Sequence, residues 1–355
     1  MMKAYIRSAA TISPQKTFND PTFLDDFAEY NNNRLTSIEP DYNEEIDPKA
    51  IRRMSRIIKM SVASALACLK EAEITKPDAI VTGTAYGCLE DTGIFLTNMV
   101  QEDEEPVTPV AFVQSTHNTI GAQVALLIKC SRYNNTFVSG GASFENALLD
   151  SMMLLSENNT ASVLVGGMDE ITDMSHAVLS RLGLYKRPPV SNVNLFDTNS
   201  PGTINGEGAA FFLLKNTSSN NDLACIEGIT TFYKPKDVAE IQQYIDSFLA
   251  SQSINYSDID LVIVGKNGDK KNDAIYTELQ QSTFKGIASV NYKHLCGEYP
   301  TSTSFAAWVG ANIIKNNNIP TALDCQDIPK NKISKVLIYN HYQNIYHSLI
   351  LMSAC

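Results

Sequence analysis

Paired cysteine motifs are absent from this sequence. Its seven cysteines are scattered, odd in number and never spaced as CxxC. A disulfide framework or a structural zinc site needs thiols at close, regular spacings, so neither is indicated. We therefore expect a protein of the reducing cytoplasm that holds no metal.

Basic clusters and long apolar runs are absent as well. The chain has 28 Lys and Arg against 39 Asp and Glu, a net charge of -11, and no segment gathers the basic residues. This charge argues against nucleic acid or an anionic membrane as a partner. No run approaches the roughly 18 apolar residues of a membrane-spanning helix. The first residues, MMKAYIRSAATISP, lack the apolar core of a signal peptide, so we expect neither export nor membrane insertion.

The chain instead alternates between short apolar runs rich in β-branched residues and longer runs with helical periodicity. The short runs predict strands at residues 79–85, 136–141, 162–169, 209–214, 260–265 and 335–340. The longer runs predict helices at residues 52–72, 118–130, 144–155, 236–252 and 304–315. Several predicted strands are apolar on both faces, as buried strands are. The pattern predicts an α/β protein whose strands are covered by helices on both sides.

A polar, turn-rich segment, KNTSSNNDLA at residues 215–224, predicts the joint between two halves. We place an N-terminal half at residues 1–215 and a C-terminal half at residues 216–355. The Asn-, Asp- and Pro-rich residues from about 13 to 48 are expected to form an extension along the surface. The acidic segment QEDEEP, residues 101–106, is expected to be a solvated loop.

Three segments are informative together: FDTNSPGTINGEGAAFFLL (196–214), SVLVGGMDE (162–170) and STHNTIGAQVALL (115–127). The first resembles a signature of the β-ketoacyl synthases of the thiolase superfamily, in which FD, a spaced glycine and GEGA precede an apolar strand. The second is similar to that family's strand ending in paired glycines and an acid, and the third to its helix at the dimer contact. The resemblance implies a thiolase-like fold: two pseudo-duplicated halves, stacked as α-β-α-β-α layers, in a dimer.

The same resemblance locates the family's catalytic positions. It implies a cysteine in the strand-to-helix turn SGGASFEN, where this chain has Gly141, with the helix N-terminus lowering the thiol pKa. It implies two histidines, where this chain has Gly265 and Glu298. Lys293 and Asp273 keep the family's residue types, while the glycine-rich C-terminal loop of the family is replaced by HYQN. The departures therefore fall on the catalytic segments.

Without a thiolate and two imidazoles, neither acyl transfer nor malonyl decarboxylation has an obvious catalyst. A scaffold that keeps its glycines and strand cores but lacks this chemistry resembles the chain-length factors of heterodimeric ketosynthases. The resemblance implies a noncatalytic subunit that pairs with an active β-ketoacyl synthase, or with itself, and shapes the acyl tunnel. It implies no cofactor and only indirect contact with acyl carrier protein. SFENALLD and KHLCGEYPTS are most similar to subunits of aryl polyene or flexirubin-type pathways.

A second hypothesis is an enzyme in its own right, a thiolase-like acyltransferase or hydrolase that uses Cys296, Ser143 or Glu298. A buried apolar role is the more frequent one for such a cysteine. His294, two residues away, is expected to point away from Cys296, so we do not expect it to act as a base for the thiol. Ser143 has no paired base in the sequence and is expected to cap a helix. Glu298 is expected to form an internal ion pair with Lys293 and to act as a structural plug.

The segment before the predicted helix at residue 118 is expected to face the partner subunit. In active relatives the acyl chain runs from the cysteine toward the dimer interface, so side chains of the partner limit its length. The resemblance implies that this tunnel and interface are lined by Phe112, Gln114, Thr116, His117 and Asn118, and that Phe112 limits the length of the acyl chain. Because side chains alternate along a strand, the sequence does not decide whether the even or the odd positions face the tunnel. The strand TFVSGG is expected to pair with its counterpart in another subunit near a two-fold axis.

Overall fold

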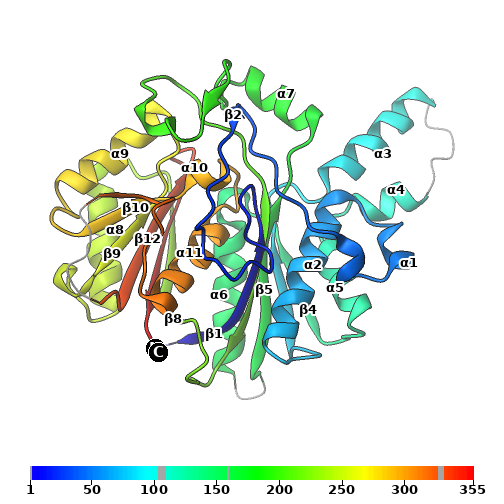
Figure 1. The fold of residues 1–355 in the computed structure, drawn as a ribbon, viewed down its shortest axis with the longest axis horizontal. Helices are drawn as coiled ribbons and strands as arrows, with labels where there is room; N and C mark the ends of the chain where they lie inside the picture. The colour runs from blue at the N-terminus through cyan, green and yellow to red at the C-terminus, as the bar shows by residue number, and fades with distance from the viewer. Residues whose placement is uncertain (1, 103–108, 158–159, 327–331) are drawn as a thin grey trace.

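Two sheet halves flank a pair of central helices, and further helices cover the outer faces (Figure 1). The structure is a computed structural model that describes residues 2–102, 109–157, 160–326 and 332–355. Seen from one side to the other, the layers alternate between helix and sheet. The predicted α-β-α-β-α arrangement is therefore confirmed.

Six long helices form the three helical layers. The central pair, α6 and α11, lies between the sheet halves, α2 and α5 cover the N-terminal half, and α8 and α9 cover the C-terminal half. Their sequences carry apolar residues at helical spacing, which is why five of them were predicted. The bounds are Ser143–Ser156 for α6, Thr303–Asn316 for α11, Arg56–Glu71 for α2, Thr119–Leu127 for α5, Val238–Ser251 for α8 and Lys270–Gln281 for α9.

The N-terminal half of the sheet has the strand order β4-β3-β5-β7-β1. β3 is parallel to β4 and β5, whereas β7 is antiparallel to β5 and β1. The strands are Ala4–Ile12 (β1), Ala79–Gly83 (β3), Tyr133–Phe137 (β4), Ser162–Asp169 (β5) and Gly208–Lys215 (β7). Only β4, at the end of this order, has a single neighbouring strand among the described residues.

The C-terminal half repeats this pattern with the order β10-β9-β12-β13-β8. β9 is parallel to β10 and β12, and β13 is antiparallel to β12 and β8. The strands are Ala224–Tyr233 (β8), Leu261–Val264 (β9), Ala288–Asn291 (β10), Lys335–Tyr342 (β12) and Tyr346–Ser353 (β13), and β11 (Asp324–Gln326) extends the edge beside β10. Five strands with the same order and directions in each half confirm the predicted duplication. The boundary after residue 215 remains a prediction; the turn that it falls on leads from β7 to β8.

Three apolar clusters correspond to these layers. The central cluster lies between the sheet halves and includes Phe144 of α6 together with Phe305 and Trp308 of α11. A second cluster packs α2 against the N-terminal sheet, and a third packs α8 and α9 against the C-terminal sheet. Each sheet is therefore buried on both faces, as continuous apolar strands require.

The remaining described elements lie at the ends and edges of the layers. α3 and α4 project from one side of the molecule, and α7 lies at the top of the view (Figure 1). Their bounds, with those of the shorter elements, are Leu89–Gln101 (α3), Pro109–Gln114 (α4), Asp173–Arg181 (α7), Pro48–Ile51 (α1), Lys293–Cys296 (α10), Asn31–Asn32 (β2), Val190–Ser191 (β6), Tyr42–Glu44 (η1), Gly140–Ala142 (η2), Leu195–Asp197 (η3) and Tyr256–Asp258 (η4).

The polar segment after β1, dark blue in Figure 1, crosses the front of the molecule. The buried Gln15 side chain donates to the backbone oxygens of Leu295 at 3.2 Å and Ala28 at 3.3 Å. Further along, Leu35 N donates to Asn205 O at 2.8 Å. Backbone polar groups of this segment are thus paired with loops from both halves of the chain.

Two segments differ from the predicted strand geometry. Residues 109–114 form α4, because Pro109 has a backbone angle suited to the first turn of a helix. Residues 293–296 form the short helix α10 and not a strand. The opposite orientation expected for His294 and Cys296 would have been wrong on a strand as well, because residues two apart on a strand point to the same face. The strand predicted at residues 136–141 lies earlier, because Gly140 has φ of 59° and turns the chain into η2.

Four of the ten strands in the two five-stranded halves were not predicted from the sequence: β1, β8, β10 and β13. The short strands β2, β6 and β11 were not predicted either. β1 and much of β8 alternate between buried and partly exposed residues, so their apolar runs are broken. β10 has only four residues, ASVN, of which half are polar. These strands form because neighbouring strands supply their hydrogen-bonding partners, which local sequence does not show.

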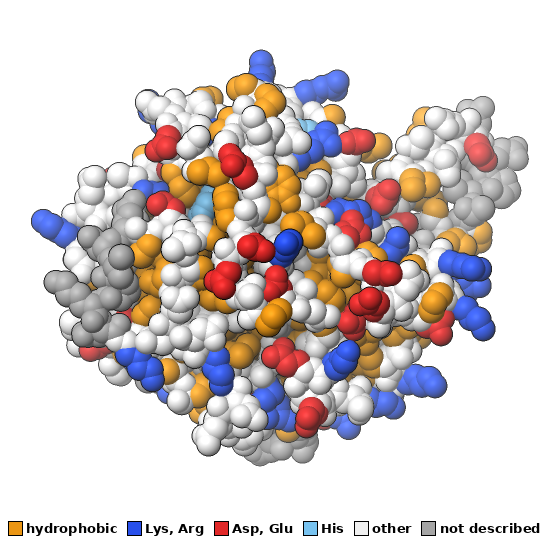
Figure 2. All heavy atoms as spheres, in the orientation of Figure 1, with side chains coloured by type: hydrophobic (Ala, Val, Ile, Leu, Met, Phe, Trp, Pro, Cys, Tyr) orange, Lys and Arg blue, Asp and Glu red, His pale blue; other side chains and the backbone are white. Residues whose placement is uncertain are grey.

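Acidic and basic side chains are interspersed on the face shown in Figure 2, without one field of Lys and Arg. In the described parts of the chain, no helix is long and apolar enough to span a membrane. Of the predicted loop QEDEEP, Gln101 ends α3, and residues 103–106 lie outside the described residues.

The central layer predicts a large stability effect for Phe305→Ala. Phe305 is fully buried and packs against Trp308 with ring centroids 5.7 Å apart. Removing a buried Phe ring costs about 3 to 5 kcal/mol, measurable as a lower denaturation midpoint. The matched control is Phe112→Ala, at a ring that is 57% exposed; equal losses for the two variants would contradict the central placement of α11.

Candidate functional site

The sequence positions implied as catalytic meet at the carboxyl end of β12. Three consecutive residues there, Asn340, His341 and Tyr342, each contact a different segment. A side chain at Gly265 would meet Asn340, and one at Gly141 would meet Tyr342. The backbone oxygen of His341 accepts from Lys293 Nζ at 3.4 Å. Residues separated by more than 150 positions in the chain are thus brought to one place.

The position of the implied nucleophile is filled by Tyr342. A Cβ atom at Gly141 would lie 2.5 Å from Tyr342 Cβ and 2.9 Å from its Cγ, closer than such atoms approach in proteins. Burial raises the pKa of Tyr342 well above its usual value, so the phenol is neutral, and its Oη lies 3.3 Å from Tyr86 Oη. The adjacent Gly140, with φ of 59°, faces the ring of Tyr346. The vacated position is therefore occupied space and not an empty pocket.

The position of the first implied histidine is filled in the same way. A Cβ atom at Gly265 would overlap Asn340 Oδ1 and lie 2.7 Å from Tyr276 Oη. Asn340 Nδ2 donates to Thr303 Oγ1 at 2.8 Å, and Tyr276 Oη accepts from the N–H of His341 at 2.8 Å. An amide and a phenol, both held by hydrogen bonds, thus leave no room for an imidazole here.

At the second implied histidine position, Glu298 forms the predicted ion pair with Lys293. Lys293 Nζ lies 2.9 Å from Glu298 Oε1 and 2.8 Å from Oε2, and Asn267 Nδ2 donates to Oε2 at 2.5 Å. Lys293 is 0% exposed and Glu298 is 4% exposed. Burial raises the pKa of Glu298, while the Lys293 ammonium acts in the opposite direction. Both Glu298 oxygens are engaged within the chain, which fits a structural plug.

Asp273, the acid that the family resemblance retains, positions Asn267. Its two oxygens accept the N–H groups of Asn267 and Gly268, each at 2.8 Å. Burial raises the pKa of Asp273 to about 6. The carboxylate thereby holds the loop after β9 in the conformation that presents the Asn267 amide to Glu298.

The GEGA segment has a structural role beside this site. A Cβ atom at Gly206 would overlap the backbone oxygen of Cys296, and Gly206 N donates to Glu298 O at 3.0 Å. Only a residue without a side chain permits this approach of two loops. The buried Glu207 accepts two bonds from Arg56, at 2.6 and 2.5 Å, a bidentate geometry that holds α2 against the signature loop.

Asp169, the acid that ends β5, links two further loops. Its Oδ1 accepts from Thr84 Oγ1 at 3.0 Å and from the N–H groups of Ala85 and Tyr86 at 2.9 and 3.2 Å. Its Oδ2 accepts from the N–H and hydroxyl of Thr301 at 3.2 and 2.8 Å. Burial raises the pKa of Asp169 to about 6. This carboxylate fixes the backbone that carries Tyr86, the hydrogen-bonding neighbour of Tyr342.

Comparison with known proteins identifies the scaffold. Residues 30–191 match the sequence model of the beta-ketoacyl synthase N-terminal domain. This part of the chain is similar to the N-terminal domain of β-ketoacyl synthases. No curated protein matches the chain by sequence.

Solved structures share the β-ketoacyl synthase fold over the whole chain. A beta-ketoacyl synthase from Burkholderia phymatum STM815 has a TM-score of 0.80 at 15% identity, covering 100% of both chains. The ishigamide ketosynthase/chain length factor has a TM-score of 0.78 at 15% identity, covering 100% of this chain and 99% of that one. A ketosynthase in complex with its chain length factor from Xenorhabdus doucetiae has a TM-score of 0.75 at 12% identity, covering 100% and 98%. The thiolase-like fold implied by the sequence is thereby confirmed.

The alternative nucleophiles of this synthase-like chain are buried. Cys296 is 0% exposed, burial raises the pKa of its thiol well above the usual value, and Sγ lies 3.3 Å from Gly297 O. Ser143 is the first residue of α6, not its N-cap, because its Oγ donates to Gly140 O at 2.7 Å and accepts from Ser139 N at 2.9 Å. Among the described residues, neither side chain has a base as its hydrogen-bond partner, which weakens the enzymatic hypothesis.

The residues predicted for the tunnel and interface lie together on α4 and the start of α5. Phe112 is exposed and packs on Phe95 with ring centroids 5.4 Å apart, while Gln114 Nε2 donates to Arg53 O. Thr116, His117 and Asn118 are exposed as well.

This exposed segment is connected to the filled nucleophile position. A Cβ atom at Gly87 would lie 3.0 Å from His117 Cα, so the two backbones are close neighbours. Gly87 follows Tyr86, whose hydroxyl group contacts Tyr342. A chain of neighbouring residues, Tyr342, Tyr86 and His117, therefore connects Gly141 to the surface just before α5.

Sequence inspection missed the residues that fill the site: Asn340, Tyr342, Tyr276 and Asn267. The size of the HYQN side chains could have indicated this filling, because HYQN places bulky side chains where the family has a glycine-rich loop. In the structure Gln343 and Asn344, with φ of 56° and 52°, form the turn between β12 and β13. Within the described residues, no group of three His, Cys, Asp or Glu is placed to hold a metal ion.

The contact at Gly141 predicts that Gly141→Cys lowers stability and creates no acylation site. Overpacking of this kind costs about 1 to 3 kcal/mol, and the new thiol would have no imidazole nearby. Tyr342→Ala should not relieve the strain, because the clash is with Cβ, whereas Tyr342→Gly should relieve part of it. The matched control is Gly93→Cys, where the nearest atom to the new Cβ is 3.5 Å away. The measurements are denaturation midpoints and mass spectrometry after incubation with an acyl-thioester; acylation of residue 141 with turnover would contradict the description of the site.

The ion pair predicts unequal effects for its two partners. Glu298→Leu leaves a buried ammonium and should cost about 3 to 5 kcal/mol. Lys293→Met leaves the Glu298 carboxyl without its partner, and burial raises the pKa of that carboxyl above the reference value of 4.5. The folded variant then binds a proton that the unfolded chain releases, so its stability is fully present below about pH 4.5 and falls as pH rises through the folded pKa. Lys293→Met should therefore lose more stability at pH 8 than at pH 5, relative to the parent chain.

Denaturant unfolding at the two pH values measures this effect. The control is Asp26→Asn, which breaks the exposed Lys16–Asp26 pair and should cost less than about 1 kcal/mol. A pH-independent loss in Lys293→Met would show that Glu298 is not held in a low-dielectric site.

Proposed function

We propose that this chain is a noncatalytic, chain-length-factor-type subunit that pairs with an active β-ketoacyl synthase. The observation that carries the proposal is the filling of all three implied catalytic positions by the chain's own side chains. Tyr342 occupies the space beside Gly141, Asn340 the space beside Gly265, and Glu298 is neutralised by Lys293. A site that had only lost its catalytic groups would be hollow, whereas this one is packed.

The packed site also argues against the steps of condensation in this chain. A thiolate is needed to carry the acyl group, and donors are needed to stabilise the negative charge that develops during decarboxylation. His341 is buried, and burial lowers its pKa well below the usual value, so it is neutral and stacks on Tyr276 at 4.6 Å. No described group supplies the missing thiolate, and nothing favours the stand-alone acyltransferase or hydrolase.

The partner surface is proposed at the free edge of β4. This strand has β3 on one side and no described strand on the other, and an unpaired edge is open to pairing with a second chain. Large apolar side chains are exposed around it: Tyr133 is 44% exposed, Val138 47%, Leu126 69% and Met153 50%. Such an apolar edge favours an obligate dimer over an isolated chain.

The acyl-limiting surface is proposed on the adjoining α4–α5 segment. In two of the similar solved structures a ketosynthase occurs with a chain length factor, and in a third, at 12% identity and a TM-score of 0.74, a ketosynthase is bound to its acyl carrier protein. By analogy, this chain would meet carrier protein only through its partner. Val110, Phe112 and Val113 are 61, 57 and 61% exposed, so an apolar surface is available to cover the end of a tunnel. The resemblance of SFENALLD and KHLCGEYPTS supports an aryl polyene or flexirubin-type pathway as the setting.

The proposal predicts activity only in a complex. This chain, co-expressed with a synthase that has the complete Cys-His-His set, should elute as a heterodimer and support condensation, while this chain alone should not decarboxylate malonyl-carrier protein.

In that complex, Phe112→Ala should lengthen products by one or more two-carbon units, because forcing a methylene into a filled space costs about 1 to 3 kcal/mol, more than the roughly 0.8 kcal/mol gained by burying it. Enlarging Thr116 should shorten them.

Product lengths are measured by mass spectrometry, with Val100→Ala as a control on the exposed end of α3. A monodisperse monomer that binds none of the candidate synthases would contradict the partner role. Unchanged lengths in an intact heterodimer would contradict the chain-length role.

A further inference from the structure

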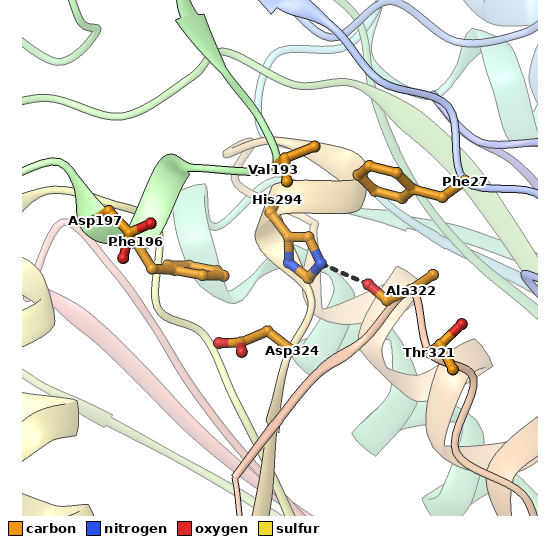
Figure 3. A pocket seen from close by; sticks show the side chains of 8 residues that line it. All are labelled: Phe27, Val193, Phe196, Asp197, His294, Thr321, Ala322 and Asp324. Carbon is orange, nitrogen blue, oxygen red and sulfur yellow. Dashed lines mark hydrogen bonds between the residues drawn. The ribbon is translucent and has the colours of Figure 1, made fainter.

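A separate hollow of about 390 Å³ is lined by residues from both halves of the chain (Figure 3). Its walls come from the segment after β1, from η3 and the turn before it, from α10, and from the start of β11 with the loop before it. Eight described residues line it: Phe27, Val193, Phe196, Asp197, His294, Thr321, Ala322 and Asp324. The size suits a small organic group and its alkyl stem.

His294 forms the inner wall of this hollow between two phenyl rings. Its ring centroid lies 6.2 Å from that of Phe27 and 5.2 Å from that of Phe196, and Figure 3 shows the two rings on opposite sides of the imidazole. The His294 side chain is nearly completely buried, with the residue 4% exposed. Both phenyl rings are partly exposed, so they are available to a molecule in the hollow.

The hydrogen bonding of His294 leaves one nitrogen without a partner. Nε2 lies 2.7 Å from Ala322 O, and because a carbonyl oxygen only accepts, Nε2 carries the proton. Burial lowers the pKa of His294, so the ring is neutral and Nδ1 is an acceptor. Nδ1 is buried and has no hydrogen-bond partner among the residues that the structure describes. An unpaired buried acceptor is costly, and it points to a ligand that supplies an N–H or O–H.

The charge of the hollow restricts that ligand further. Asp197 and Asp324 line its rim and are exposed, and none of the eight lining residues is Lys or Arg. Asn291 Nδ2 donates to Asp324 Oδ2 at 2.6 Å, which leaves Oδ1 for another donor. The lining therefore offers two carboxylates, one neutral nitrogen acceptor and two aromatic rings.

We propose that this hollow binds an organic cation that carries N–H donors, a guanidinium or primary ammonium group on an alkyl stem. One N–H donates to His294 Nδ1, the positive charge lies against Asp197 and Asp324, and the stem and cation pack on Phe27 and Phe196, whose ring faces attract positive charge. The site does not depend on the proposed chain-length role, because it shares no lining residue with the packed positions.

Calorimetric titration of the full chain tests the site with three small probes of similar shape. Butylguanidinium and butylammonium should bind, and neutral butylurea should bind about 10- to 100-fold more weakly, since hydrogen bonds to charged groups are the stronger ones. A fourth probe, N-acetyl-arginine amide, separates two sources of the cation: binding comparable to butylguanidinium points to the side chain of a partner protein, and exclusion points to a free amine or guanidine.

Variants then identify the residues involved. Asp197→Asn and Asp324→Asn should each weaken butylguanidinium binding about two- to fivefold, whereas Glu44→Gln, a loss of charge on a distant exposed turn, should not change it. His294→Phe should weaken binding about tenfold, and His294→Gln, which keeps an acceptor, should restore part of it. The proposal is overturned if butylurea binds as well as butylguanidinium, or if the double variant Asp197→Asn, Asp324→Asn binds it unchanged. Because the two aspartates are exposed, these variants stay informative even if His294→Phe fails to fold.

Discussion

The interior of this chain depends on the fit of the carboxyl end of β12 against residues that have no side chain. Tyr342 packs where a Cβ atom of residue 141 would lie, and Asn340 packs where one of residue 265 would lie. Protein interiors tolerate neither voids nor overlaps of this size. The glycines and the bulky residues are therefore a matched set, and a change at one member leaves either a clash or a cavity. This reciprocity distinguishes a site rebuilt for packing from one that has only lost its catalytic groups.

Buried acids hold the loops around that fit. Asp169, Asp273 and Glu207 accept hydrogen bonds from backbone amides or from Arg56; Asp169 and Glu207 are buried, and Asp273 is partly buried. A buried carboxylate is tolerated when its oxygens are paired. These residues belong to the stretches that resemble β-ketoacyl synthases, so much of the family signature in this chain is explained by architecture alone. These carboxylates therefore stabilise the scaffold independently of any reaction.

The same scaffold leaves two surfaces with unsatisfied chemistry. The edge of β4 and the α4–α5 segment expose apolar side chains, and the hollow at His294 exposes an acceptor between two carboxylates and two phenyl rings. The first surface is large and apolar, which suits a protein partner. The second is small and acidic, which suits a cation. The functions proposed for the two surfaces depend on different residues, so each can be tested independently of the other.

The periodicity of the sequence was sufficient for the α/β class, for five of the six layer-forming helices and for most central strands, because buried elements carry continuous apolar patterns. The motifs were sufficient for the resemblance to β-ketoacyl synthases, and that resemblance implied that Gly141, Gly265 and Glu298 stand at the family's catalytic positions. Half-buried β1 and short, polar β10 were not predicted, because their formation depends on neighbouring strands. Helical rather than extended geometry at residues 109–114 and 293–296 was missed for a similar reason: short segments take their conformation from what they pack against.

By itself the sequence determined what is absent from the site, since a glycine has no side chain in any fold. It also placed Lys293 and Glu298 five residues apart, close enough for the ion pair to be predicted. Only the tertiary structure decided what replaced the missing groups, because Tyr342, Asn340 and Tyr276 reach those positions across the sheet from distant parts of the chain. The hollow at His294 was likewise decided by tertiary structure: its carboxylates, rings and unpaired nitrogen come from four separate segments, and no local pattern connects them.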